Sequence, residues 1–205
     1  MKFSSKSLED AVDAFASLPG IGKKNALRMA LYLAGKGKEK SESFAAAISR
    51  MGDRLKECRK CHNYSDEELC AICRDPARRG QILCVVESAR DVMAIEDTQQ
   101  FSGRYHVLGG VISPIDGVGP EDIHISSLLE RVTREGVEEM IMAISPSIEG
   151  ETTTYYISQR LSHTDVKISV IARGISFGGD LEYADEITLG RSILGRLPYQ
   201  SKDNL

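Results

Sequence analysis

The chain contains no tryptophan, and aromatic residues make up only 6% of its 205 residues. Its core must therefore consist mainly of aliphatic side chains, which at this length supports one or two domains together with smaller modules that need extra support. A hydrophobic fraction of 41% and a charged fraction of 27% are typical of a packed globular protein. This composition excludes a disordered or fibrous chain.

Long apolar runs are also missing. No stretch reaches the roughly 18 to 20 apolar residues that span a bilayer, and Met1 leads into Lys2, Ser4 and Lys6 rather than into an apolar signal segment. We therefore expect a cytoplasmic protein without a membrane partner. Such a reducing compartment disfavours disulfide bonds between the five cysteines.

The charge is divided unevenly along the chain. Residues 1–56 carry 11 basic and 6 acidic side chains, whereas residues 81–205 carry 10 basic and 19 acidic ones. A basic amino-terminal part joined to an acidic carboxy-terminal part predicts two surfaces with different partners. One partner is expected to be a polyanion, and the other a cationic protein surface or divalent metal ions.

Four cysteines form two C-x2-C pairs, Cys58 with Cys61 and Cys70 with Cys73, separated by eight residues. This spacing predicts a tetrahedral zinc site, because each pair forms a tight knuckle and the segment between them closes the loop. Four protein ligands leave no open coordination position, so the zinc is expected to be structural. His62 is interpreted as a surface residue, and the remaining cysteine, Cys84, as a buried residue on a strand.

The first part of the chain is predicted to be helical, over residues 7–17, 23–33 and 41–56. The Leu-Pro-Gly-Ile-Gly turn between the first two helices resembles the helix-hairpin-helix motif of DNA-repair proteins. Two glycines around one aliphatic residue present backbone amides to a phosphate at a helix start, and cations follow directly. The candidate DNA-binding residues are Gly20, Ile21, Gly22, Lys23, Lys24 and Arg28. The alternative is an ordinary glycine-rich turn with solvated lysines.

The second part alternates between strand and helix. Strands are expected at residues 82–87, 105–108, 139–145 and 167–172, with helices at 88–98, 123–134, 152–161 and 185–194. This alternation predicts an α/β fold with a small doubly wound parallel sheet.

Acidic residues fall where the predicted strands end, at Glu87 and Asp91 after the first strand and at Glu149 and Glu151 after the third. Functional residues of such sheets lie beyond the carboxyl ends of the strands. Four carboxylates there favour a bound cation, with magnesium as the candidate ion, or a basic partner. The alternative is that Glu149 and Glu151 only cap a helix.

Together these segments resemble the RecR family of bacterial recombination mediators. The resemblance depends on the order of the LPGIG hairpin, the four cysteines, CVVES, YHVLGGVISPIDGVGPEDI, SPSIEGETTTYYI and RGISFGGDLEYADEITL, and it covers nearly the whole chain. It implies a helix-hairpin-helix domain at 1–54, a four-cysteine zinc finger at 55–78, a Rossmann-like Toprim domain at 79–175 and an assembly segment at 176–205.

The resemblance further implies a DNA-repair protein that acts with RecO and RecF to help load RecA onto gapped DNA, as a ring-shaped homotetramer in the nucleoid. Lys24 and Arg28 match the residues credited with DNA contact, and Glu87, Asp91, Glu149 and Glu151 match the Toprim acids. Catalytic Toprim proteins hold magnesium with a D-x-D pair, whereas this chain has Glu149-Gly-Glu151 and no accompanying nucleophilic tyrosine motif. We therefore expect no enzyme activity and interpret the acids as a docking surface for RecO. A metal-dependent nuclease or nucleotidyl transferase is the alternative.

Overall fold

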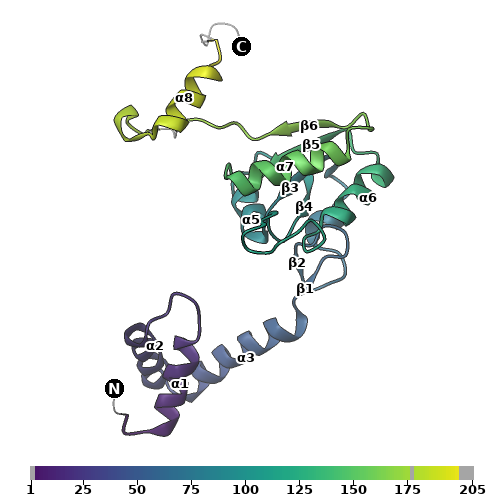
Figure 1. The fold of residues 1–205 in the computed structure, drawn as a ribbon. Coiled ribbons are helices and arrows are strands. Elements are labelled where there is room, and N and C mark those ends of the chain that lie inside the picture. The colour runs from purple at the N-terminus through teal and green to yellow at the C-terminus, as the bar shows by residue number, and fades with distance from the viewer. Residues whose placement is uncertain (1–2, 176–177, 199–205) are drawn as a thin grey trace, which may run out of the picture. The chain divides into compact units, whose positions relative to one another are not determined.

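The computed structural model describes residues 3–175 and 178–198, and the chain divides into two compact units. The first unit holds residues 1–56 and 65–67, and the second holds residues 57–64 and 68–205. Figure 1 traces the elements of each unit along the chain. No helix in the described ranges is both long and apolar enough to cross a membrane.

The first unit contains three helices, α1 (Lys6–Ala16), α2 (Lys23–Gly35) and α3 (Lys38–Arg54). They confirm the three helices predicted from the sequence, although α3 begins earlier than expected. Helices α1 and α2 pack together through Val12, Ala26 and Ala30, which are all buried. Small side chains at this contact let the two helices approach closely and hold the hairpin between them in place.

The second unit is built on a parallel sheet with the strand order β4-β3-β5-β6. Its strands are β3 (Arg79–Val86), β4 (Gly103–Val107), β5 (Glu139–Ala143) and β6 (Lys167–Val170). The four predicted strands are therefore confirmed. The last four residues of β3 are all buried, as expected for a central strand that is covered on both faces.

Helices cover both faces of this sheet (Figure 1). Leu83 and Val85 of β3 point to the face covered by α6 (Ile125–Glu135) and α7 (Ile148–Arg160). Cys84 and Val86 point to the other face, against α5 (Ala89–Asp97). This alternation confirms the doubly wound sheet and the buried position predicted for Cys84.

Helix α7 begins at Ile148, whereas the sequence pattern predicted a start near Thr152. Ser147 caps the helix, because its hydroxyl accepts a hydrogen bond from the amide of Gly150 at 3.0 Å. A side chain at position 150 would not fit, since a Cβ atom there would collide with the carbonyl oxygen of Ser145. Glu149 and Glu151 consequently belong to the first helical turn.

Short elements complete the described fold. The zinc-finger segment contains β1 (Lys56–Glu57), β2 (Tyr64–Ser65) and α4 (Ala71–Arg74), which the sequence analysis did not anticipate. A 3-10 turn (Leu181–Tyr183) and α8 (Glu186–Leu194) follow β6, and α8 confirms the predicted helix at 185–194. Residues 176–177 and 199–205 of the predicted assembly segment lie outside the described residues.

Candidate zinc centre and nucleic-acid interface

The four cysteines of the two C-x2-C pairs come together as predicted. Their sulfur atoms all lie within 4.8 Å of one another, every one of the four residues is buried, and none forms a disulfide. Two tight turns bring them there. The amide of His62 donates to the carbonyl oxygen of Cys58 at 2.8 Å, and the amide of Cys73 donates to the sulfur of Cys70 at 3.4 Å.

This cluster fits a structural zinc ion. Zinc–sulfur bonds of about 2.3 Å in a tetrahedron place the sulfurs about 3.8 Å apart, and Sγ of Cys61 lies 3.6 Å from Sγ of Cys70. Hydrogen bonding with Cys70 raises the pKa of Cys61, whereas the same contact lowers the pKa of Cys70 to about 2. The neighbouring thiols thus stabilise the thiolate form of Cys70. Four thiolate ligands would close the coordination shell and leave the zinc no catalytic position.

The finger is attached to the sheet domain within the second unit. The amide of Val107, at the end of β4, donates to the carbonyl oxygen of Cys61 at 2.8 Å. Arg131 of α6 is 2% exposed and donates to the carbonyl oxygens of Tyr105 at 2.6 Å and Lys60 at 3.3 Å. Because these contacts join the finger to β4 and α6, the zinc centre and the sheet support each other.

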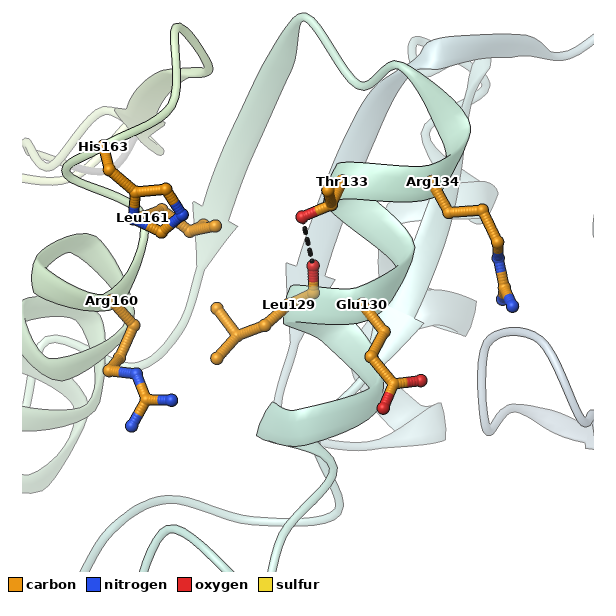
Figure 2. Close-up of a pocket in the computed structure, with 7 residues that line it drawn as sticks. All are labelled: Leu129, Glu130, Thr133, Arg134, Arg160, Leu161 and His163. Atoms are coloured by element: carbon orange, nitrogen blue, oxygen red, sulfur yellow. Dashed lines mark hydrogen bonds between the residues drawn. The ribbon is translucent and has the colours of Figure 1, made fainter.

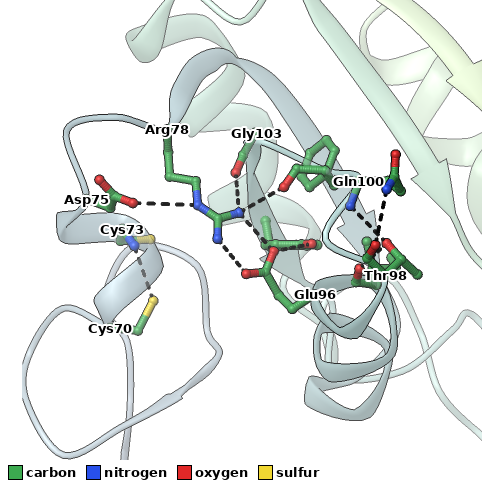
Figure 3. A network of polar contacts seen from close by, with 11 residues as sticks. Cys70, Cys73, Asp75, Arg78, Glu96, Thr98, Gln100 and Gly103 are labelled. Atoms are coloured by element: carbon green, nitrogen blue, oxygen red, sulfur yellow. Dashed lines mark hydrogen bonds and ion pairs between the residues drawn. The ribbon is translucent and has the colours of Figure 1, made fainter.

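A second anchor lies just beyond the last zinc ligand, at Arg78 (Figure 3). Its guanidinium forms a bidentate ion pair with the carboxylate of Glu96 on α5, with N–O distances of 2.8 and 2.5 Å. It also donates hydrogen bonds to the carbonyl oxygens of Phe101 and Gly103. Tyr105 donates its hydroxyl proton to the same carboxylate at 2.7 Å. The hydrogen bond from Arg78 holds the pKa of Glu96 below its usual value.

Replacing Arg78 by methionine is expected to lower the free energy of unfolding by about 2–3 kcal/mol, because Glu96 would keep its charge in a partly buried site without its partner. Urea unfolding of the zinc-loaded chain at pH 7 measures this, with exposed Arg90→Met as the control. The stabilisation from ionised Glu96 is present above its unfolded pKa, near 4.3, and is lost as the pH falls through its lower folded pKa. The difference between variant and parent should therefore shrink on acidification, and equal stabilities at pH 7 would contradict the anchor.

The predicted hairpin of the first unit lies between α1 and α2. Gly20 has φ of +79°, a left-handed conformation that glycine adopts without strain, and the amide of Ile21 donates to the carbonyl oxygen of Leu18 at 3.1 Å. Gly22 is the N-cap of α2 and supplies no side-chain cap. The start of α2 therefore presents its first amides outward.

Cations surround this helix start. Lys23, Lys24 and Arg28 are all exposed, and none of them has an ion pair among the described residues. Lys24 and Arg28 are separated by one helical turn and lie on the same side of α2. The arrangement supplies outward amides and free positive charges together, which is the combination that a phosphate requires.

The four predicted Toprim acids all lie at the carboxyl ends of β3 and β5, but each has its own contacts. Oε1 of Glu87 accepts the amide of Ser145 at 2.6 Å, and Asp91 forms a capping box with Ser88 at the start of α5. Among the described residues, no three of the acids have oxygens close enough together to form a metal-binding group. The structure thus brings these side chains to one edge without gathering them around one point.

Among the four acids, Glu151 makes two ion pairs with described residues. Its Oε1 lies 2.7 Å from Arg173 and 3.2 Å from Arg191 of α8. The hydrogen bond from Arg173, together with the charge of Arg191, lowers the pKa of Glu151. Glu149 is half-buried in the same turn of α7. A magnesium role for these acids stays a prediction.

The prediction of a surface position for His62 was wrong. Its side chain is only 17% exposed and stacks on His124, with ring centroids 3.7 Å apart. Glu57 completes a group with these two histidines that sequence reasoning missed entirely. His124 lies far along the chain from the other two residues, so only the packing of the finger on α6 brings the three together.

A shallow pocket of about 580 Å³ lies between α6 and α7 (Figure 2). It contains none of the residues predicted from the sequence. Leu129, Glu130, Thr133, Arg134, Arg160, Leu161 and His163 line it.

Comparisons with known proteins agree with this architecture. Three RecR family models match, for the helix-hairpin-helix at residues 8–51, the four-cysteine zinc finger domain at 55–75 and the C-terminal segment at 174–197, and a Toprim domain model matches residues 81–172. The chain is 54% identical over 198 residues to Recombination protein RecR of Porphyromonas gingivalis, covering 97% of this chain and 96% of the relative. It is 51% identical to that of Cytophaga hutchinsonii over the full length of both chains. This chain belongs to the RecR family.

Membership of the RecR family supports a role in recombination and repair, since its relatives are named recombination proteins rather than enzymes. The matched zinc finger model agrees with the four-cysteine cluster, so the family comparison and the geometry both support structural zinc. The helix-hairpin-helix match covers the RecR hairpin described above and suggests DNA binding. The resemblance inferred from the sequence is thereby confirmed.

Proposed function

We propose that this chain is a non-catalytic, sequence-independent DNA-binding recombination mediator that acts with RecO and RecF to help load RecA onto gapped DNA. The observation that carries the proposal is the exposed hairpin. The start of α2 has no side-chain cap, and Lys23, Lys24 and Arg28 beside it form no ion pair within residues 3–175 and 178–198. Backbone amides and flexible cations contact phosphates and do not distinguish bases. The DNA-contacting set is Gly20, Ile21, Gly22, Lys23, Lys24 and Arg28.

Affinity for DNA should therefore fall steeply with salt and depend little on base sequence. Each phosphate neutralised contributes about 0.9 to the slope of log affinity against log salt for duplex DNA, and about 0.7 for single strands. Fluorescence anisotropy with labelled duplex, single-stranded and gapped oligonucleotides of two unrelated sequences, at several salt concentrations, tests the proposal. A salt-independent affinity, or a strong preference for one sequence, would contradict it.

The acidic edge of the sheet is proposed as the docking surface for RecO. Glu149 and Glu151 stand in the first turn of α7, and Glu87 and Asp91 follow the neighbouring strand β3. The excess of acids after residue 80 gives this part of the chain the charge that a basic partner surface would complement.

Reversing both charges, Glu149→Lys with Glu151→Lys, is expected to abolish RecO capture in a pull-down, because two attractive charges become repulsive at the centre of the surface. Zinc content should not change, since the finger lies elsewhere on the sheet domain. Glu130→Lys with Glu138→Lys is the matched control, as it alters two exposed acids outside this edge. Unaltered capture by the first variant, or equal losses in both, would remove the acidic edge from the interface.

Metal-dependent strand cleavage or nucleotidyl transfer is the second candidate function, and the Toprim match is the observation in its favour. The contacts of the acids support the non-catalytic proposal instead, because three of these carboxylates already have a partner within the chain. Glu87 accepts a hydrogen bond from a backbone amide, Asp91 caps a helix, and Glu151 forms an ion pair. Magnesium-dependent nicking by the purified protein that is lost in Glu87→Gln would reverse this preference.

Self-assembly into a homodimer or a ring-shaped tetramer is part of the proposal. Large apolar side chains remain exposed on α2 and α3 and in the C-terminal segment, and such surface favours burial against another copy. They are Leu31, Tyr32, Ile48, Met51, Leu181, Tyr183, Ile187, Ile193, Leu194 and Leu197. We also propose the domain boundaries 1–54, 55–78, 79–175 and 176–205, and a cytoplasmic, nucleoid-associated location. Mass measurement in solution with and without DNA tests the assembly.

A further inference from the structure

A second group of metal-ligand side chains lies beside the cysteine cluster, within the same unit of the chain. Oε2 of Glu57 is 3.4 Å from Nδ1 of His62 and 3.7 Å from Nε2 of His124. All three ligand atoms lie within 4.8 Å of one another. Two bonds of about 2.05 Å at the tetrahedral angle separate ligand atoms by about 3.3 Å, so these separations suit ligands of one ion.

The hydrogen bonds of His124 determine which of its nitrogens is free. Its Nδ1 lies 3.1 Å from the carbonyl oxygen of Val107. A carbonyl only accepts, so Nδ1 carries the proton, and in the neutral ring Nε2 presents a lone pair towards Glu57. A histidine that donates one ring N–H to a backbone carbonyl and directs the other nitrogen inward has the arrangement typical of metal ligands.

The contacts of His62 also direct one of its ring nitrogens towards Glu57. Its Nε2 lies 2.9 Å from the hydroxyl oxygen of Ser127, and that hydroxyl donates its proton to the carbonyl oxygen of His124 at 3.2 Å. Nδ1 of His62 lies within hydrogen-bond distance of Oε2 of Glu57, at 3.4 Å, and a carboxylate only accepts, so each ring nitrogen of His62 has an oxygen to which it can donate. A divalent ion at this point would replace the long hydrogen bond between His62 and Glu57, and it would meet the carboxylate together with the free nitrogen of His124.

The backbone of His62 is a separate observation. Its φ of 61° lies in the left-handed region, which glycine adopts most easily. This position directly follows Cys61, whose backbone already turns tightly around the sulfur cluster. The left-handed backbone at this turn sets where the imidazole of His62 leaves the chain, beside Glu57 and His124.

We propose that Glu57, His62 and His124 bind a second divalent metal ion, separate from the four-cysteine centre, with Zn²⁺ as the ion that suits this ligand set. Two imidazoles and one carboxylate are borderline nitrogen and oxygen ligands, which zinc accepts readily, and three protein ligands leave a fourth position open to water. Because Glu57 and His62 belong to the finger and His124 precedes α6, the ion would fasten the finger to the sheet domain.

Binding requires a local movement of the two rings. They lie stacked, with planes 14° apart, whereas each lone pair must lie in its own ring plane when it meets the ion. The rings are therefore expected to turn apart as the ion enters. The side chains of Glu57 and His124 are 54% and 32% exposed, which gives an ion access from solvent. The movement offers a second readout, the loss of ring stacking.

Cobalt(II) titration of the full-length, zinc-replete protein tests the site, because cobalt bound by nitrogen and oxygen shows d–d absorption without the thiolate charge-transfer bands of a four-cysteine site. We expect one saturable equivalent, with affinity reduced about 10-fold or more in Glu57→Gln, His62→Gly and His124→Gln. His163→Gln is the matched control, since His163 lies outside the group. NMR of the imidazole protons during titration with zinc should show the stacked rings separating.

Several results would overturn the proposal. One is that the zinc-replete protein binds no further equivalent, and another is that the control loses as much affinity as His124→Gln. Unchanged ring shifts in the presence of saturating zinc would equally exclude His62 and His124 as ligands. One tightly held zinc per chain in every variant confirms that the four-cysteine centre is intact, and the test does not depend on DNA binding.

Discussion

Replacing Cys58 or Cys73 by alanine is expected to release the structural zinc and unfold the finger. Besides the four cysteines, the core of the finger contains only the partly buried Leu69 and Ile72 among the described residues, so the metal supplies most of its folding free energy. Structural zinc in small fingers binds with an apparent free energy of about 10–16 kcal/mol at pH 7, and losing one thiolate removes much of it.

The loss should extend into the sheet domain. Without a folded finger, the amide of Val107 loses the carbonyl of Cys61, and buried Arg131 loses the carbonyl of Lys60. Zinc analysis measures the loss of the metal, limited trypsin digestion measures the unfolding of the finger, and thermal unfolding measures the loss of stability in the sheet domain. Trypsin is expected to cleave at Arg59, Lys60 and Arg74 inside the unfolded finger. The protein should also melt at a lower temperature.

Cys84→Ala is the matched control for this experiment. Cys84 is as buried as the ligands but lies on β3, outside the cluster, so its replacement should leave one zinc per chain. The free energy of unfolding should fall by about 1 kcal/mol, because removing the sulfur leaves a small cavity. A Cys58→Ala protein that is free of zinc and as resistant to trypsin as the parent would show that the metal does not hold the finger together.

Reversing the two cations of the hairpin, Lys24→Glu with Arg28→Glu, is expected to weaken DNA binding by about 100-fold at moderate salt, because two phosphate contacts become repulsive. Both side chains are exposed and have no ion pair among the described residues, so the fold should not change. The slope of log affinity against log salt concentration should also become less steep, by about 1 for each lost phosphate contact. Fluorescence anisotropy measures the affinity, and circular dichroism confirms that the helices remain.

Arg50→Glu with Arg54→Glu provides a control of equal charge. These residues are exposed on α3, in the same unit but away from the hairpin. If only the net charge of the unit mattered, both variants would lose the same affinity. If the hairpin binds the backbone of DNA, the control should lose only a few-fold, because charges beyond about 10 Å are largely screened at physiological salt. Equal losses, or full affinity in the hairpin variant, would contradict the proposed interface.

Local features of the fold were well predicted where a hydrophobic pattern or the spacing of cysteines determined them. The continuous apolar run of β3 indicated a strand buried on both faces, and the two C-x2-C pairs indicated a closed metal site. The start of α7 was predicted near Thr152, whereas the helix begins at Ile148. The actual signal was the capping hydroxyl of Ser147 together with Gly150, which alone fits against the carbonyl of Ser145.

The contacts of the charged residues were less predictable. Glu151 was expected to belong to an acidic cluster that binds a cation or a basic partner. In the structure it pairs with Arg173 and Arg191 of the same chain, which are 22 and 40 positions away. The pairing of Arg78 with Glu96 was likewise invisible, because neither residue stands out from the charged residues around it. Such partners depend on where the chain returns, and no local pattern encodes that position.

The sequence by itself determined the modules of this protein: a helical hairpin with cations, a four-cysteine zinc finger and a parallel sheet with acids at its edge. Each of these follows from short-range spacing, since helical period, strand period and ligand spacing are all local properties of the chain. Only the tertiary structure decided that His62 stacks on His124 beside Glu57, and that Arg131 joins the finger to α6. These contacts form because burial of the finger against β4 and α6 brings together residues that the sequence keeps far apart.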